Sequence, residues 1–190
     1  MIINFFKHLH TINKHRFKVF VMCCKCGFPI RGLLHDLSKY HPTEFFEGVK
    51  YYTDGKSSPI LNAKKKLGYS NAWLHHKGRN KHHSEYYLDL TSPNKAPIIP
   101  FKYMVEMVCD KIAAAKTYEK KKYKNITPYY YWNKSRDLEV MNKKMQAFLT
   151  EVFELLGAYG ESTVLNKKYL KNIYDKHVKR GGKKYGKKIS

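Results

Sequence analysis

The feature that most constrains the fold is the spacing of the apolar residues, which recur at three- to five-residue steps along most of the chain. Residues 5–26 illustrate it, with Phe5, Leu9, Ile12 and Phe17 on one repeating stripe. This period is typical of amphipathic helices, and no segment shows the two-residue alternation of a convincing strand. The pattern therefore predicts an all-α fold, with helical segments at residues 5–26, 42–52, 60–76, 82–90, 101–118, 137–156 and 164–178 and a further one that begins near Ile30.

The sequence predicts where two of the helices end, one after the His35-Asp36 pair and one at Gly157. We expect the helix that begins near Ile30 to continue through His35 and Asp36, so that this pair lies in a helix rather than in a loop. Gly157 is expected to end the helix over residues 137–156, because glycine is common just after the last helical turn. The leucines that would share one side of the earlier helix are Leu33, Leu34 and Leu37.

Length and charge limit the class of protein. A chain of 190 residues is long enough for one ordinary domain with a real core and short for two. Lysine and arginine total 37 against 15 acidic residues, which gives a formal charge of +22. This charge favours anionic partners and nonspecific contact with nucleic acid, although a solvated lysine surface has the same composition. We expect one domain over residues 1–178 and a disordered basic tail over residues 179–190.

The N-terminus and the cysteines indicate a cytoplasmic protein. Charged residues and histidines interrupt every apolar run in residues 1–20, so neither a signal peptide nor a membrane span is expected. Three of the four cysteines are too close together to pair with one another and lack the spacing of a zinc site. We expect reduced cysteines that act mainly as small buried hydrophobic residues: Cys23, Cys24, Cys26 and Cys109.

Three short stretches contain the residues suited to chemistry. They read Leu-His-Asp-Leu-Ser-Lys at residues 34–39, His-His-Lys-Gly-Arg-Asn-Lys-His-His at 75–83 and Cys-Asp-Lys at 109–111. Imidazole and carboxylate ligands suit Mn, Fe, Zn, Ni or Co, so we expect one or two divalent transition metals as the cofactor. Asp110 lies in an apolar helix, where an unpaired carboxylate would be costly. It therefore needs a metal or a donor such as Lys111 or Lys116.

The order of these residues resembles the HD superfamily of phosphohydrolases, whose helical domains bind metal through a first-helix histidine, an adjacent His-Asp pair and a distant aspartate. The resemblance implies a metal-site core over residues 5–118 and C-terminal helices over residues 128–178. Lys39 completes the HDxxK form of members that cleave cyclic dinucleotides, although their Gly-Tyr-Pro element is absent here. Histidines between the pair and the last aspartate would allow a second metal. The implied ligands are His15, His35, Asp36, His76, His82, His83 and Asp110, and which histidine of each pair, 75/76 and 82/83, binds is open.

This resemblance, together with the basic charge, predicts hydrolysis of a phosphoester in a nucleotide or a related phosphorylated small molecule. Asp36 and Lys39 would be catalytic, and Lys39, Lys77 and Arg79 would bind the phosphate. The residues around the motifs also look like a family of small uncharacterised bacterial and phage proteins, which implies no reaction. They are Glu44-Phe45, Trp73-Leu74-His75-His76 and Glu106-Met107.

Two other functions fit the same sequence. Some HD-type proteins resemble oxygenases with two irons, which would use the same ligands. A nucleic-acid-binding protein would use the basic surface and the tyrosines at residues 129–131, and its His/Asp cluster would be structural. Individual residues also have plainer interpretations, such as a buried histidine hydrogen-bonded to a carboxylate or a solvated basic loop over residues 75–83. The oligomeric state is open.

Overall fold

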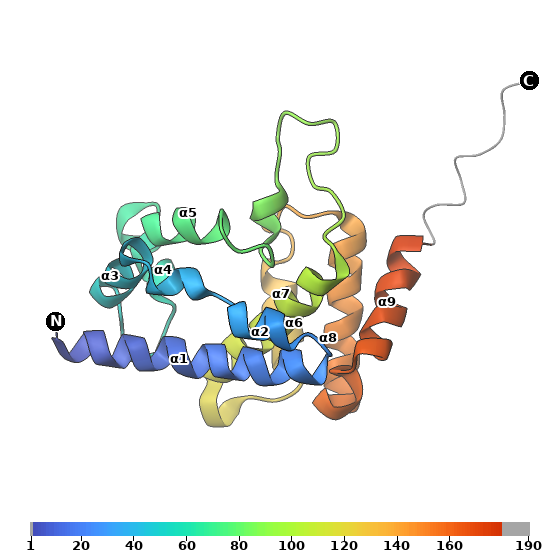
Figure 1. Ribbon diagram of the computed structural model, residues 1–190, viewed down its shortest axis with the longest axis horizontal. Coiled ribbons are helices and arrows are strands. Elements are labelled where there is room, and N and C mark those ends of the chain that lie inside the picture. Colours follow the sequence, from blue (N-terminus) through green and yellow to red (C-terminus); the bar gives the residue numbers. More distant parts are fainter. Residues whose placement is uncertain (1, 180–190) are drawn as a thin grey trace, which may run out of the picture.

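Figure 1 shows the computed structural model of the protein, of which residues 2–179 are described. Every regular element in this range is helical, which confirms the all-α prediction. The first half of the chain forms α1 (Ile2–Lys25), α2 (Pro29–Leu34), the 3₁₀ helix η1 (Leu37–Tyr40), α3 (Pro42–Lys50), α4 (Pro59–Leu67), α5 (Asn71–Lys77) and η2 (Ser84–Tyr87). The second half forms α6 (Phe101–Glu119), η3 (Lys120–Lys122), α7 (Thr127–Ser135), α8 (Lys143–Val164) and α9 (Lys167–Lys179).

Helix α6 is the central element of the main core. Residues 104–109 are buried one after another, so this part of α6 is covered on all sides. Phe148, Val152 and Leu156 of α8 belong to the same core, together with parts of α9 and the C-terminal part of α1. In Figure 1, α8 and α9 lie at one end of the described chain, and α1 extends from there to α3. A helix segment that is covered on all sides needs residues on every side that can be buried, and Glu106 is the one charged residue among 104–109.

Helices α3, α4 and α5 form a smaller group beside the N-terminal part of α1 (Figure 1). Its apolar cluster is built on three buried residues, Ile12, Phe45 and Val49. A polar contact also joins α3 to α5, because the Glu47 carboxylate accepts hydrogen bonds from two backbone N–H groups at the start of α5, at 3.1 and 3.2 Å. Helix N-termini favour negative charge, so Glu47 helps to position the helix on which the stretch 75–83 begins.

The prediction for the second helix is wrong at its C-terminal end. Helix α2 ends at Leu34, and Asp36 has the left-handed conformation (φ 51°, ψ 29°), so His35 and Asp36 lie in the turn before η1. The side of α2 that packs on α1 is formed by Gly32, where a Cβ would lie 2.7 Å from the Cβ of Cys23. This close approach places the other side of α2 at the surface. Leu33 and Leu34 of α2 are accordingly 61% and 46% exposed, and Leu37 of η1 is 48% exposed.

The prediction that Gly157 ends a helix is also wrong. Helix α8 continues past this residue, where a Cβ would lie 2.3 Å from Cδ1 of Ile126. Gly157 therefore permits close packing against the segment before α7 rather than a helix end. The helix instead kinks at Gly160, whose φ of 75° is one that glycine adopts readily.

Further segments differ from the predictions: α8 begins at Lys143 rather than at residue 137, and α7 over Thr127–Ser135 was not among the predicted helical segments. Residues 60–76 form two helices, because Gly68 has a φ of 82° and ends α4. In residues 82–90, helical structure is confined to η2. Lys179 still belongs to α9, and the rest of the predicted tail, residues 180–190, lies outside the described residues.

The cysteines pack as predicted, with one exception. Cys23, Cys26 and Cys109 are buried in the main core as free thiols, whereas Cys24 is exposed. Within residues 2–179, the groups of side chains suited to holding a metal include no cysteine. None of the helices in this range combines the length and the apolar composition that a membrane crossing requires.

Candidate metal centre

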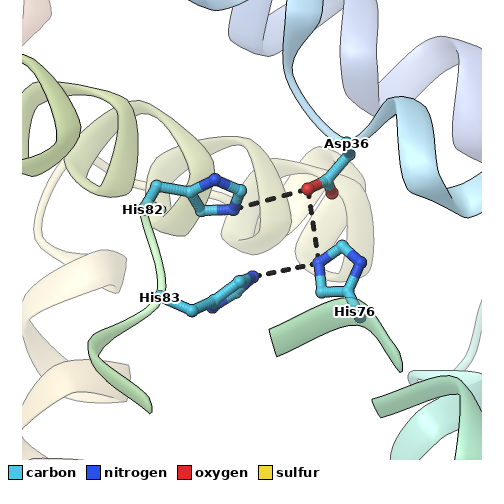
Figure 2. Close-up of side chains that lie close together, drawn as sticks. All are labelled: Asp36, His76, His82 and His83. Carbon is cyan, nitrogen blue, oxygen red and sulfur yellow. Dashed lines mark hydrogen bonds and ion pairs between the residues drawn. The ribbon is translucent and has the colours of Figure 1, made fainter. Parts of the chain in front are cut away.

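Asp36 lies at the centre of the His/Asp cluster. Its carboxylate is 1% exposed and comes from the turn between α2 and η1. Figure 2 shows one oxygen, Oδ1, facing two imidazoles: it lies 3.3 Å from His76 Nε2 and 3.4 Å from His82 Nε2. The other oxygen, Oδ2, lies 3.3 Å from His35 Nε2. The left-handed backbone therefore directs one carboxylate toward two different sets of ligands.

The first set joins three parts of the chain that are distant in sequence. His15 from α1 places its Nε2 atom 3.0 Å from Oδ1 of Asp110 on α6, and His35 Nε2 lies 3.6 Å from the same oxygen. The lysines considered as donors to Asp110 pair elsewhere: Lys111 with Glu139 and Lys116 with Glu161, both at 2.6 Å. The potential ligand atoms of this set lie within 4.8 Å of one another, and they belong to His15, His35, Asp36 and Asp110.

The second set consists of Asp36 and three histidines from the stretch 75–83 (Figure 2). His76 comes from α5, whereas His82 and His83 lie just before η2. The Nε2 atoms of His76 and His83 are 3.0 Å apart, a separation at which two imidazoles share either a proton or a cation. Both sets thus contain Asp36, and the structure brings together all seven residues that the HD resemblance implied as ligands.

Several inward-facing atoms of both sets lack a hydrogen-bond partner within residues 2–179, although other polar atoms lie close by. Leaving a buried donor or acceptor unpaired costs about 1–3 kcal/mol for each group. A cation between them would satisfy several of these groups at once, and nitrogen and carboxylate ligands suit a divalent transition metal. The donor set therefore fits such a metal. The unpaired atoms are His15 Nε2, His35 Nε2, His82 Nε2 and both carboxylate oxygens of Asp36.

Glu106 on α6 orients two of these histidines from behind. His35 Nδ1 donates a hydrogen bond to its Oε1 atom at 3.1 Å, and His82 Nδ1 lies 3.2 Å from the same oxygen. Arg31 Nε donates to the other oxygen at 2.9 Å. Burial alone would raise the pKa of Glu106, but the two histidines lower it to about 2. An ionised carboxylate on Nδ1 leaves Nε2 directed at the cluster, which is the usual arrangement behind a metal-binding histidine.

Glu44 on α3 has the same role for His76. The Nδ1 atoms of His75 and His76 donate to the two oxygens of Glu44, at 2.6 and 2.7 Å. Burial alone would raise the pKa of Glu44, but these hydrogen bonds and the charge of His76 lower it. His75 itself stacks on His41, with ring centroids 4.3 Å apart. It therefore supports Glu44 from outside the cluster.

Lys39 and His83, which both lie beside Asp36, differ in charge. Lys39 Nζ lies 3.1 Å from Asp36 Oδ2. Burial alone would lower the pKa of Lys39, but Asp36 and Asp110 raise it, so this lysine carries a positive charge. By contrast, burial lowers the pKa of His83 well below its ordinary value, and the charges of neighbouring histidines act in the same direction. His83 is therefore neutral, which is the form that binds metal.

The sequence matches one protein-family model over residues 4–155, and that model is described as "Family of unknown function (DUF5662)". The chain belongs to this family. No curated protein and no solved structure matches the chain. In this DUF5662 protein the matched range contains every residue of the two ligand sets, but the family description assigns them no activity.

The DUF5662 chain has a cavity of about 430 Å³ that reaches the cluster. Two of the predicted phosphate-binding residues, Lys77 and Arg79, do not line it. They lie at the C-terminal end of α5, where Arg79 Nη1 donates to the backbone carbonyl of His75 at 3.3 Å. The lysines that do line the cavity are Lys39, Lys64 and Lys111.

Sequence reasoning missed the carboxylates that support the histidines. Glu106 precedes Asp110 by four residues, so helical periodicity places both on one side of α6, and the sequence contains that signal. Glu44 has no comparable signal, because its position beside His76 depends on how α3 packs on α5. The same is true of Lys64, which reaches the cavity from α4.

Proposed function

We propose that this protein is a metal-dependent hydrolase that binds two divalent transition metals and cleaves a phosphoester. The observation that carries the proposal is the position of Asp36, a buried carboxylate shared by both ligand sets, whose Oδ1 faces two ligand histidines while Oδ2 faces His35 and the Lys39 ammonium. A carboxylate between two metal sites is suited to the in-line displacements of two-metal phosphoester chemistry. His15, His35 and Asp110 would complete one site, and the three histidines of Figure 2 the other.

When bound, the metals would supply a water of lowered pKa and Lewis acidity toward the phosphoryl oxygens. The chain's own groups have simpler roles. Glu106 and Glu44 hold the imidazoles in the orientation and tautomer that ligation requires. Lys39, charged and on the cavity wall, would stabilise negative charge on the phosphate.

The substrate that fits best is a phosphorylated small molecule. A cavity of about 430 Å³ has the size of a typical small-ligand site, and the formal charge of +22 attracts anions.

The test is phosphatase activity of protein purified without a histidine tag, stripped of metal and reloaded with manganese under anaerobic conditions. Phenyl phosphate and mononucleotides serve as substrates. We expect Asp36→Asn to lower kcat/KM by about 100-fold or more, because the shared ligand loses its charge. Asp89→Asn, which changes an exposed loop carboxylate, should retain activity. Equal activity in the wild type and Asp36→Asn would contradict the proposal.

The same ligands would also suit two irons that activate oxygen. The iron-loaded protein in air is therefore compared with the manganese-loaded protein under anaerobic conditions. Turnover that requires iron and oxygen, with no phosphoester cleavage under manganese, would replace hydrolysis by oxygenase chemistry.

A further inference from the structure

The cavity extends beyond the cluster to Trp73 and Lys64. Trp73, on α5, places its ring centroid 5.0 Å from that of His83 and 5.9 Å from that of His76. Lys64, on α4, places its ammonium 4.6 Å from the centroid of the same indole. All four residues line the cavity. The indole therefore contacts both the ligand histidines and a lysine within the same cavity.

Lys64 differs from the other lysines on the cavity wall. Lys39 is paired with Asp36 at 3.1 Å, and Lys111 with Glu139 at 2.6 Å. Within residues 2–179, no carboxylate lies within 4.0 Å of the Lys64 ammonium, which also makes no hydrogen bond there. Partial burial lowers the pKa of Lys64, and the charge of Glu85 acts in the opposite direction from beyond ion-pair distance, so the ammonium is partly withdrawn from water without a direct ion pair. A half-buried cation without an acidic partner is suited to binding an anion from solution.

We propose that Lys64 and Trp73 form a second anion subsite, so that the preferred substrate carries two anionic groups: one at the metal ligands and one at Lys64, joined by a planar body that packs on the indole. This inference rests on the proposed function and specifies its substrate class. The Lys64 ammonium lies over the Trp73 ring, and an indole is also a favourable packing surface for an aromatic body. Lys64 would contribute a charge-assisted hydrogen bond to the second anion.

The test compares phenyl phosphate with para-phenylene bisphosphate, which adds a second phosphate to the same ring. With the wild type we expect a KM about 10-fold lower for the bisphosphate, the value of one charge-assisted hydrogen bond. Lys64→Met should abolish this preference, so that the KM for the bisphosphate becomes equal to that for phenyl phosphate in the same variant. Lys66→Met, on an exposed lysine of the same helix, should retain the preference. A third compound, para-carboxyphenyl phosphate, tests whether the subsite accepts any anion or only phosphate.

Binding separates this inference from the proposed hydrolysis. Calorimetric titration of the metal-loaded protein with phenylphosphonate and para-phenylene bisphosphonate, which are not hydrolysed, should give the same preference and the same loss in Lys64→Met. A preference in binding without any turnover would support the subsite and contradict the hydrolase. The absence of a preference in the wild type, or a preference that persists in Lys64→Met, would overturn the subsite.

Discussion

Asp36 combines a left-handed backbone conformation with a buried carboxylate. The left-handed region is sparsely populated by residues other than glycine, although aspartate tolerates it better than most. At this position the conformation turns the carboxylate inward to face His35, His76 and His82. Non-glycine residues in such conformations cluster at functional sites, which agrees with a metal-binding role.

Glu106→Gln should weaken metal binding without unfolding the protein. The amide has one oxygen where the carboxylate has two, so it cannot serve both His35 and Arg31 as Glu106 does. We expect a loss of about 10- to 100-fold in metal affinity, measured by competition with a chromophoric chelator. The control is Glu139→Gln, which removes the partner of Lys111 at the edge of the cluster. Unchanged affinity in Glu106→Gln would mean that the histidines do not depend on this carboxylate.

His8 provides a pH dependence outside the ligand sets. It is buried against Gly48, where a Cβ would lie 2.1 Å from its Nε2 atom. Burial, followed by the charge of Lys39, lowers its pKa from 6.5 to about 4. The unfolded chain therefore takes up a proton near pH 6.5 that the folded chain takes up only near pH 4, and folding stability falls as the pH falls through this window.

Denaturant unfolding of the wild type and His8→Gln measures this effect. From about pH 7 to about pH 5 the wild type should lose up to about 2 kcal/mol more than the variant, since the variant lacks the titrating imidazole. His10→Gln, which changes an exposed histidine of the same helix, should follow the wild type. Parallel pH profiles for the wild type and His8→Gln would show that His8 does not titrate in this way.

At the scale of elements, apolar periodicity identified α6, missed α7 although its Trp132 is buried, and failed where apolar residues lie at the surface. Residues 101–118 match α6 closely, because Val105, Val108, Ile112 and Ala115 are buried at helical spacing. The leucines of α2 misled the prediction, since the buried side of this short helix is a glycine that admits α1. Glycine has two roles in this chain, close packing at Gly157 and helix termination at Gly68, and sequence alone does not separate them.

Gly32→Ala tests whether the contact between α1 and α2 positions the His-Asp pair. The new Cβ would lie 2.7 Å from the Cβ of Cys23 and 2.8 Å from the Cα of Phe20, so one helix must move. We expect a loss of about 1–3 kcal/mol in the free energy of unfolding and weaker metal binding, because α2 leads directly into His35. Gly78→Ala is the matched control, since its Cβ would meet no atom closer than 3.6 Å. Equal stability of the two variants would contradict the packing argument.

At the scale of the whole molecule, the described chain has a large apolar core and a smaller group of helices that relies on polar contacts. The core joins α6, α8 and α9, whereas the cluster around α3 contains three buried apolar residues. The ligand sets lie between these parts, with Asp110 on α6 and His76 on α5.

The His/Asp residues could be predicted from their order in the sequence. The supporting carboxylates and the cavity wall could not, because they depend on tertiary packing. Metal binding itself stays a prediction.

The difference between the main core and the group of α3, α4 and α5 predicts that metal removal destabilises the smaller group more than the core. Chelation should raise amide hydrogen exchange in α3 and α5 well before it affects α6 and α8, because the smaller group would lose the ligands that tie it to the core. Hydrogen-exchange mass spectrometry with and without chelator measures this difference. A uniform change across all four helices would indicate that the ligand sets do not hold the smaller group in place.

The central claim is that the two ligand sets hold two metals. The most direct measurement is elemental analysis of untagged wild-type protein after metal reconstitution and dialysis, beside two variants of confirmed fold, Asp36→Asn and His83→Gln. His177→Gln, which removes a histidine paired with Glu151 far along the chain, is the control. We predict about two equivalents of metal in the wild type and the control, about one in His83→Gln and fewer than one in Asp36→Asn. A folded wild type that retains no metal, or an Asp36→Asn variant that retains as much as the wild type, would contradict the account.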